Sequence, residues 1–180
     1  MVVVAALMFV PPLSAEAEDR TEKEIAAAKA FNIEGVKLGM SKEEFLQLFP
    51  EAVEDSKRSR PDIGVEALRV DNTGKTSGID VKLLDGKVIE VYAFYTDSRV
   101  EEMGGVGTLA ERLVLKFGKA EANSPGRTEG GKLALIWRIH GAAFWCKLSK
   151  APDITAINYV GVKGYALMLD RKRKIADPGF

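Results

Sequence analysis

"GVKLGMSKEEFLQLFPEA", residues 35–52, decides the fold, because it carries the signals of a short helix that needs a surface to pack on. Ser41 and Glu44 have the spacing of a capping box, in which each side chain bonds the backbone N–H of the other residue. Apolar residues follow at spacings of three and four, at Phe45, Leu48 and Phe49. Pro50 cannot continue a helix. We therefore predict a helix that ends before Pro50 and buries one apolar stripe.

"GVGTLAERLVLKFGKAEA", residues 105–122, repeats this pattern with different residues. Thr108 and Glu111 have the capping-box spacing, so the helix is expected to start beside Thr108. The apolar stripe comprises Leu109, Leu113 and Phe117. Gly118 can adopt the left-handed conformation that ends a helix.

A short helix is predicted ahead of these two, from Thr21 to about Phe31. Thr21 and Glu24 again have the spacing of a capping box. Alanines, the best helix formers, follow them. We expect this helix to lead into the fold.

Segments with the alternation of half-buried strands follow each of the two helices that repeat the pattern. After the first come "VEALRV" (65–70) and a hairpin over residues 78–95. After the second come "LALIWRIHG", "AAFWCKLS" and "DITAINYV", with "GYALMLD" (164–170) as a possible final strand. Each half therefore reads as one helix followed by three strands.

The register of the hairpin over residues 78–95 follows from its turn. A three-residue loop over residues 85–87, with its glycine at a bulge, sets Val81 opposite Val91 and Lys82 opposite Glu90. That register pairs apolar with apolar residues and opposite charges with each other. A two-residue loop would set Val81 opposite Glu90, so we favour the longer loop.

These elements predict an α+β fold made of two tandem helix-plus-antiparallel-sheet units, with the helices packed on one face of the sheet. The units are expected over residues 18–100 and 101–180, in one continuous globular domain. Neither helix buries its stripe alone, and one extended sheet would cover both.

A small helix introduced by Gly39-Met40-Ser41 and followed by an antiparallel sheet resembles the unit of the SmpA/OmlA (BamE-like) superfamily of small bacterial envelope proteins. The tandem form resembles the scaffold of the secreted beta-lactamase inhibitory proteins. Glu44, Phe45, Phe49 and, in the second half, Phe117-Gly118 carry the resemblance, which covers about residues 33 to 170. It implies a non-catalytic protein outside the cytoplasm that binds another protein through the open face of its sheet.

The N-terminal segment has the build of a signal peptide. An apolar run from Val2 to Val10 precedes Ala15-Glu16-Ala17, which is an A-x-A arrangement of small residues. The run is shorter than the roughly 20 residues that a membrane-spanning helix needs. We expect residues 1–17 to be removed and the mature chain to lack a transmembrane segment; the alternative is an apolar first strand or helix of the fold.

Composition excludes several classes of function. The chain has 180 residues, 26 basic and 26 acidic, so it has no positive field for a nucleic acid. Cys146 is the single cysteine and His140 the single histidine, which together cannot form a structural zinc set. We expect no metal, no cofactor and no catalytic residues, hence a protein that is not an enzyme.

Two glycine-rich stretches partly match nucleotide-binding motifs. "NTGKTSG" (72–78) ends like a phosphate loop, but Arg69 stands where the first glycine should be, and a strand follows instead of a helix. We interpret it as a polar turn. "GVGTLA" (105–110) is a variant of the dinucleotide fingerprint, which requires a preceding strand and a following parallel strand. We interpret its glycines as a bend, and keep a cytoplasmic nucleotide-binding protein using Gly105 and Gly107 as one alternative.

Four further features have ordinary structural interpretations. His140 falls at a hairpin turn, and Cys146 lies in phase with apolar neighbours as a buried thiol. The basic run over residues 171–174 is expected in a solvated tail. A solvated loop is expected for the acidic residues Asp97, Glu101 and Glu102.

The sheet face turned away from the helices is the candidate binding surface. Alternation places aromatic and basic side chains on it. The candidates are Tyr92, Phe94, Arg138, His140 and Trp145. Two other interpretations stay open at this point: a chain terminus or longer helix covers that face, or the face closes a homodimer.

We therefore expect a periplasmic or secreted α+β protein that binds another envelope or secreted protein through this face. A small-ligand carrier with its pocket between the helices and the sheet is a second alternative.

Overall fold

The computed structural model describes residues 21–123, 134–150 and 154–176. The α-helices in this part of the chain are α1 (Glu22–Lys29), α2 (Lys42–Leu48), α3 (Asp97–Glu102), α4 (Gly105–Phe117) and α5 (Val162–Ala176). The strands are β1 (Val53–Glu54), β2 (Val65–Asp71), β3 (Gly78–Leu84), β4 (Lys87–Thr96), β5 (Ala122–Asn123), β6 (Ala134–Ile139), β7 (Phe144–Lys150) and β8 (Ile154–Gly161). Two short 3-10 turns, η1 (Pro61–Ile63) and η2 (His140–Ala142), precede β2 and β7.

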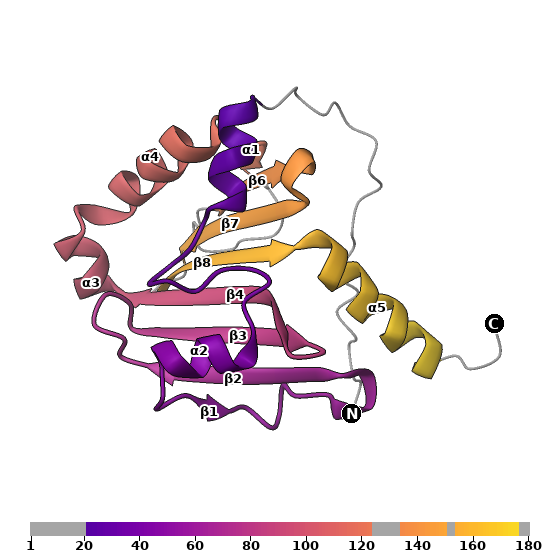
Figure 1. Cartoon of the computed structure of the whole chain (residues 1–180). Coiled ribbons are helices and arrows are strands. Elements are labelled where there is room, and N and C mark those ends of the chain that lie inside the picture. Colours follow the sequence, from indigo (N-terminus) through magenta and orange to yellow (C-terminus); the bar gives the residue numbers. More distant parts are fainter. Residues whose placement is uncertain (1–20, 124–133, 151–153, 177–180) are drawn as a thin grey trace, which may run out of the picture.

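One antiparallel sheet organises the molecule, in the order β1-β2-β3-β4-β8-β7-β6-β5 (Figure 1). The order is symmetric about the β4–β8 pair, and the chain runs twice through one helix and four strands, from α2 to β4 and from α4 to β8. The predicted α+β class is confirmed. Each half has one more short strand than predicted, and the interpretation of the halves as copies of one unit stays a prediction.

The main core lies between the sheet and the helices α1, α2, α3 and α4. Its central members are aromatic side chains that meet edge to face, with Phe31 between Phe117, Phe144 and Tyr159 at ring-centroid distances of 5.1, 5.8 and 4.9 Å. Trp137 is fully buried beside them and donates its indole N–H to the Gly118 carbonyl at 2.8 Å. Because alternate side chains of each strand point to opposite faces, those on the other face of the sheet do not contribute to this core.

The caps of α1 and α2 confirm the sequence prediction. Thr21 with Glu24 and Ser41 with Glu44 each form both bonds of a capping box. The stripe of α2 is only partly as predicted: Phe45 and Phe49 are buried, whereas Leu48 is exposed and its tip lies near Gly35.

The start of α4 differs from the prediction. The helix begins three residues earlier than its expected cap, after Gly104, whose φ of 91° and that of Gly105, 86°, turn the chain sharply into the helix. Thr108 lies inside the helix and donates its hydroxyl to the Gly104 carbonyl at 2.7 Å. The stripe of Leu109, Leu113 and Phe117 is buried as predicted, and Gly118 ends the helix with a positive φ.

The hairpin register is confirmed, but its turn is not. Val81 pairs with Val91 and Lys82 with Glu90, while the loop has two residues, Asp85 and Gly86, both with positive φ. Two left-handed residues form a turn whose twist matches the strands. The register shift is instead absorbed by a bulge next to Leu83, which turns Val88 to the main core and Ile89 to the opposite face.

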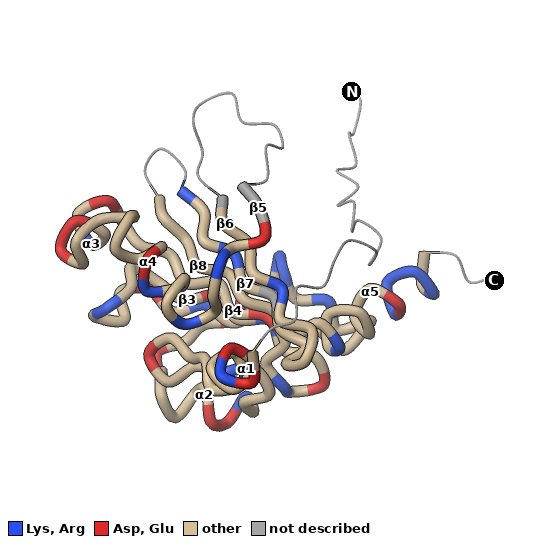
Figure 2. The backbone as a smooth tube through the Cα atoms, turned by 90° about the horizontal axis from the view of Figure 1, so that it is seen from above, with Lys and Arg blue, Asp and Glu red and all other residues tan. Residues whose placement is uncertain are grey.

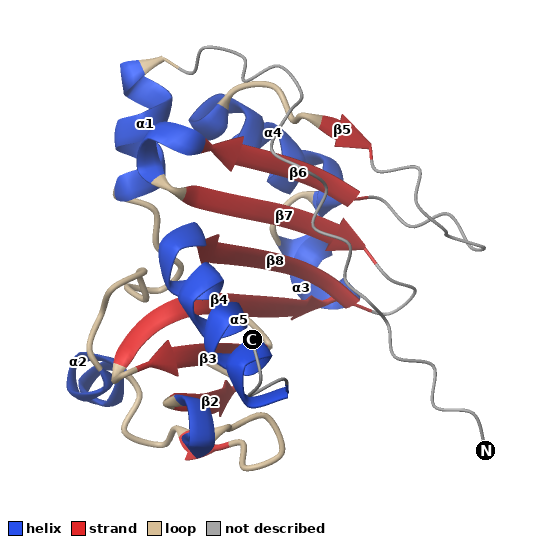
Figure 3. Cartoon of the chain, turned by 90° about the vertical axis from the view of Figure 1, so that its right-hand side faces the viewer, coloured by secondary structure: helices blue, strands red, loops and turns tan. Residues whose placement is uncertain are grey.

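The predicted final strand over residues 164–170 is wrong, because these residues belong to α5. The basic run over residues 171–174 also lies in α5 and not in a tail, although Lys172, Arg173 and Lys174 are exposed as predicted. Tyr165, Met168 and Leu169 recur at helical spacing and pack on a second apolar cluster. Figure 3 shows α5 in front of β8 and β4, with α3 and α4 behind the sheet. The interpretation that a helix covers the outer face is therefore correct for one end of that face.

The acidic residues Asp97, Glu101 and Glu102 lie in α3 and not in the predicted loop, although all three are exposed. The polar turn over residues 72–78 is confirmed between β2 and β3. The predicted signal peptide, residues 1–17, lies outside the described residues. None of the helices in the described segments is long and apolar enough to cross a membrane.

Candidate functional site: the outer face of the sheet

The outer face is the sheet surface opposite α1 to α4, and the strand register defines its rows. One row runs from Arg69 through Asp80 and Tyr92 to Asn158. The next row places Phe94 between Gly78 and Ala156. At one end of the face α5 covers the strands. The part around Tyr92 and Phe94 has no helix over it among the described residues, and we call it the open part of the outer face.

Tyr92 and Phe94 lie side by side and are partly exposed, with ring centroids 6.4 Å apart. Phe94 leans over Gly78, where an added Cβ would lie 2.1 Å from its ring. The guanidinium of Arg69 lies 5.3 Å from the Phe94 centroid, within cation–π range. Three neighbours therefore fix the position of this ring.

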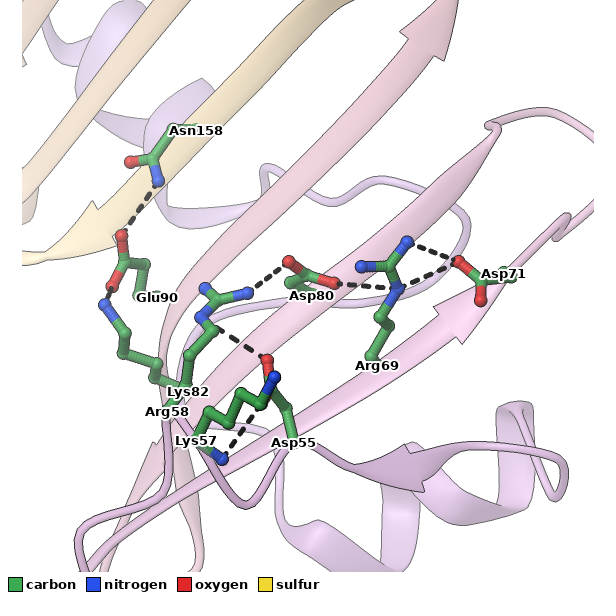
Figure 4. Close-up of polar contacts among 9 residues, drawn as sticks. All are labelled: Asp55, Lys57, Arg58, Arg69, Asp71, Asp80, Lys82, Glu90 and Asn158. Atoms are coloured by element: carbon green, nitrogen blue, oxygen red, sulfur yellow. Dashed lines mark hydrogen bonds and ion pairs between the residues drawn. The ribbon is translucent and has the colours of Figure 1, made fainter.

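Ionic contacts link side chains on the strands that carry and flank the two aromatic residues; Figure 4 draws these charged side chains. Asp80, whose side chain is 10% exposed, pairs with Arg58 from the β1–η1 loop and lies 3.9 Å from the Nε of Arg69. Arg69 also bonds Asp71 at 2.9 Å. A buried carboxylate is tolerated only with such partners, so these contacts hold Asp80 in place and orient both arginines.

A second chain of contacts lies on the other side of Tyr92. Lys82 pairs with Glu90 at 2.5 Å, and Asn158 donates its amide to the other oxygen of Glu90 at 2.9 Å. These bonds join β3, β4 and β8 across the open part of the outer face. Two buried acceptors in the row, Asp80 Oδ1 and Asn158 Oδ1, have no hydrogen-bond partner within the part of the chain that the structure describes.

Tyr92 is held in its neutral form. Burial raises the pKa of its hydroxyl, and the negative charge of Asp80 raises it further. The hydroxyl is therefore a donor at physiological pH. An apolar ring with a neutral donor at its tip suits contact with a protein surface.

The other three predicted candidates lie away from these rings. Arg138 is engaged at the β6 edge, where its backbone N–H and its Nη1 bond the two oxygens of Glu121 at 3.0 and 2.9 Å. His140 is exposed in η2, at the turn predicted for it. Trp145 pairs with Val160 and Arg138 in the register, and its side chain is outside the described part of the structure.

Only part of the charged frame of this surface was predictable from the sequence. This frame comprises Arg58, Arg69, Asp71, Asp80, Lys82 and Glu90. The Lys82–Glu90 pair followed from the register, but the signal for Asp80 was only its alternation with apolar neighbours. Arg58 comes from a loop, and no local pattern predicts that it pairs with a side chain on β3, 22 residues further along the chain.

Enzyme-like features are scarce in the described segments, where no group of three or more His, Cys, Asp or Glu side chains could hold a metal ion. Cys146 is fully buried as predicted, and burial raises the pKa of its thiol far above the ordinary range. Gly105 and Gly107 follow α3 instead of a strand, and each described strand pair is antiparallel, so the dinucleotide arrangement is not formed there.

One hollow between the helices and the sheet has a volume of about 150 Å³ and lies between α4 and the loop after α1. Ligand pockets usually measure about 300 to 1,000 Å³. A second hollow, of about 370 Å³, reaches that size, but it is an open depression on the outside of α4, lined by Ala110, Glu111, Val114 and Leu115. The open part of the outer face is therefore the better candidate for a functional surface.

We compared the chain with models of protein families, with curated proteins and with solved structures. None of the three comparisons found a match. The resemblance to the SmpA/OmlA superfamily thus stays a prediction that rests on the residues quoted for it, and the assignment of function rests on the outer face itself.

Proposed function

We propose that this protein is a non-catalytic binding protein that takes another protein on the open part of the outer face. The observation that carries the proposal is the partly exposed pair of Tyr92 and Phe94, flanked by Arg69. Tyrosine and arginine are enriched among the residues that dominate binding energy in protein interfaces, and phenylalanine is common at their centres.

Preorganisation of the surface supports the proposal. The ring of Phe94 is positioned by Gly78, and Arg69 is oriented by Asp71. Side chains that are already ordered lose less conformational entropy when a partner binds. Charged groups around the rings then favour one orientation of the partner over others.

The shape of the surface favours a protein over a small ligand. The outer face presents a row of side chains across four strands, whereas small ligands are held in concave pockets. The small-ligand alternative would need a larger cavity than the hollow of about 150 Å³ beside α4.

The proposal includes a periplasmic or secreted location, with an envelope or secreted protein as the partner. The apolar run from Val2 to Val10 and the small residues before the acidic segment support this location. Fractionation of source cells tests it separately from the binding itself.

Affinity capture from extracts of the source cell tests the function. Tyr92→Ala should reduce capture of a specific partner by about 30-fold, the effect of losing a hot-spot residue of about 2 kcal/mol. Leu115→Ala is the matched control, because Leu115 is exposed on α4, away from the outer face. Equal capture by both folded variants, or no specific partner for the unchanged protein, would contradict the proposal.

A further inference from the structure

The C-terminal helix α5 packs on a surface of its own, separate from the main core. Ile63, Val65, Leu84 and Ile89 form a small apolar cluster on the outer face. Met168 is the one residue of α5 buried in it, with Tyr165 and Leu169 partly buried at its rim.

A specific polar clamp adds to this apolar contact. Arg171 bonds both carboxylate oxygens of Asp85 at 2.8 and 2.7 Å and also donates to the Ile63 carbonyl at 3.1 Å. Gly64 makes room for the clamp, since an added Cβ would lie 2.6 Å from Asp85 and 2.8 Å from Arg171. The surface is thus built for an apolar helix face followed by an arginine.

The hold on α5 is weak compared with the main core. Most of its residues are exposed, including Val162, Leu167 and Ile175, and basic residues crowd its C-terminal end (Figure 2). A helix of 15 residues is marginal in water on its own. Elements with few buried apolar contacts open at a lower free energy than the whole domain does.

We propose that α5 is an exchangeable ligand of its own sheet, and that the surface beneath it binds an amphipathic helix of a partner protein. A partner helix that binds this surface carries apolar residues at the spacing of Tyr165, Met168 and Leu169. Two residues further on it carries an arginine that reaches Asp85. Release of α5 uncovers Ile89 beside Glu90, which enlarges the open part of the outer face. The inference extends the proposed function but does not depend on Tyr92 or Phe94.

A peptide with the sequence of residues 162–176 tests the exchange on the full chain. A tethered helix acts at an effective concentration in the millimolar range, so the unchanged protein should bind the labelled peptide poorly. The double variant Met168→Asp/Arg171→Ala frees the surface and should bind it at least tenfold more tightly. A peptide carrying the same two changes should not bind.

A disulfide gives the matched control. An ideal Cβ on Gly164 lies 3.1 Å from the Ile89 Cβ, close to the separation of about 3.5 to 4.5 Å in disulfides, so Ile89→Cys/Gly164→Cys should pin α5. Buried Cys146 will not compete. Added to the double variant, the oxidised pair should abolish peptide binding, and reduction should restore it.

Hydrogen exchange on the unchanged protein covers the case in which the double variant unfolds. The α5 amides should exchange at least tenfold faster than those of β4 and β8, through an opening that leaves the sheet protected. No peptide binding by a folded double variant, or exchange of α5 only together with the sheet, overturns the inference. The two proposals can be tested separately. If Tyr92→Ala loses partner capture, and the same substitution leaves peptide binding by the double variant unchanged, the two surfaces act independently.

Discussion

The ring of Phe94 lies directly over Gly78 on the neighbouring strand, so close that a Cβ at position 78 would fall 2.1 Å from the ring. Glycine is depleted in β-strands, and where it occurs, as here at the first residue of β3, another group often approaches its backbone closely. Here that group is the aromatic ring at the centre of the open part of the outer face. The glycine therefore belongs to the surface that we propose for binding.

Gly78→Val should displace the Phe94 ring from its position over residue 78 and break its contact with Arg69. We expect a loss of about 1–3 kcal/mol in the free energy of unfolding, the range for overpacked sites. Urea denaturation followed by circular dichroism measures it. An unchanged stability would show that the ring is not held against Gly78.

Gly107→Ala should stabilise the protein, whereas Gly78→Val should destabilise it. Gly107 lies in the first turns of α4 with ordinary helical φ, and nothing lies within 4 Å of an added Cβ. Alanine reduces the entropy of the unfolded chain, so the free energy of unfolding should rise by about 0.4–1 kcal/mol. A fall in the urea midpoint would refute the position of this residue inside the helix.

Ser41→Ala and Thr108→Ala should differ, although the sequence suggests the same role for both residues. Ser41 caps α2 through the Glu44 N–H at 3.1 Å, so its loss should cost about 1 kcal/mol. Thr108 caps no N–H and should change stability by less than about 0.5 kcal/mol. Equal losses in thermal denaturation would mean that α4 begins at Thr108 after all.

The clamp between Asp85 and Arg171 should make the attachment of α5 depend on pH. The hydrogen bonds from Arg171 lower the pKa of Asp85 below its ordinary value of 3.8. A lowered pKa in the folded state gives stabilisation that is complete above about pH 4 and is lost as the pH falls through the lowered value. Exchange of α5 amides, corrected for intrinsic rates, should therefore accelerate below pH 4.

Asp85→Asn should remove this acceleration and leave α5 loosened at every pH. Asp62→Asn is the control, because Asp62 is a similar carboxylate whose pKa is lowered by Arg60 rather than by α5. If Asp62→Asn removed the acceleration as completely as Asp85→Asn, the clamp would not be its cause.

Local signals in the sequence predicted much of this fold. The capping boxes at Thr21 and Ser41, the buried stripe of α4 and the pairing of Lys82 with Glu90 all depend on residues close in sequence or on one hairpin. The start of α4 was missed because Gly104 and Gly105 turn the chain before Thr108 can cap it.

The C-terminal helix and the charged frame were harder to predict, because they depend on distant parts of the chain. "GYALMLD" is apolar enough for a strand. Its apolar residues are spaced as in a helix, but this spacing is explained only by their packing on Ile89 and Leu84 of the sheet. Likewise, Asp80 is stabilised by Arg58 from a loop 22 residues away. No spacing within a short window contains that information.

Site-specific photo-crosslinking in the source cell tests the central claim most directly. A photoreactive phenylalanine analogue replaces Tyr92 in one protein and Leu115 in another, so that the two probes differ only in the face they occupy. We predict a discrete adduct with one partner protein at position 92 and none at position 115. An adduct at position 115 alone, or none at position 92, would contradict binding through the outer face of the sheet.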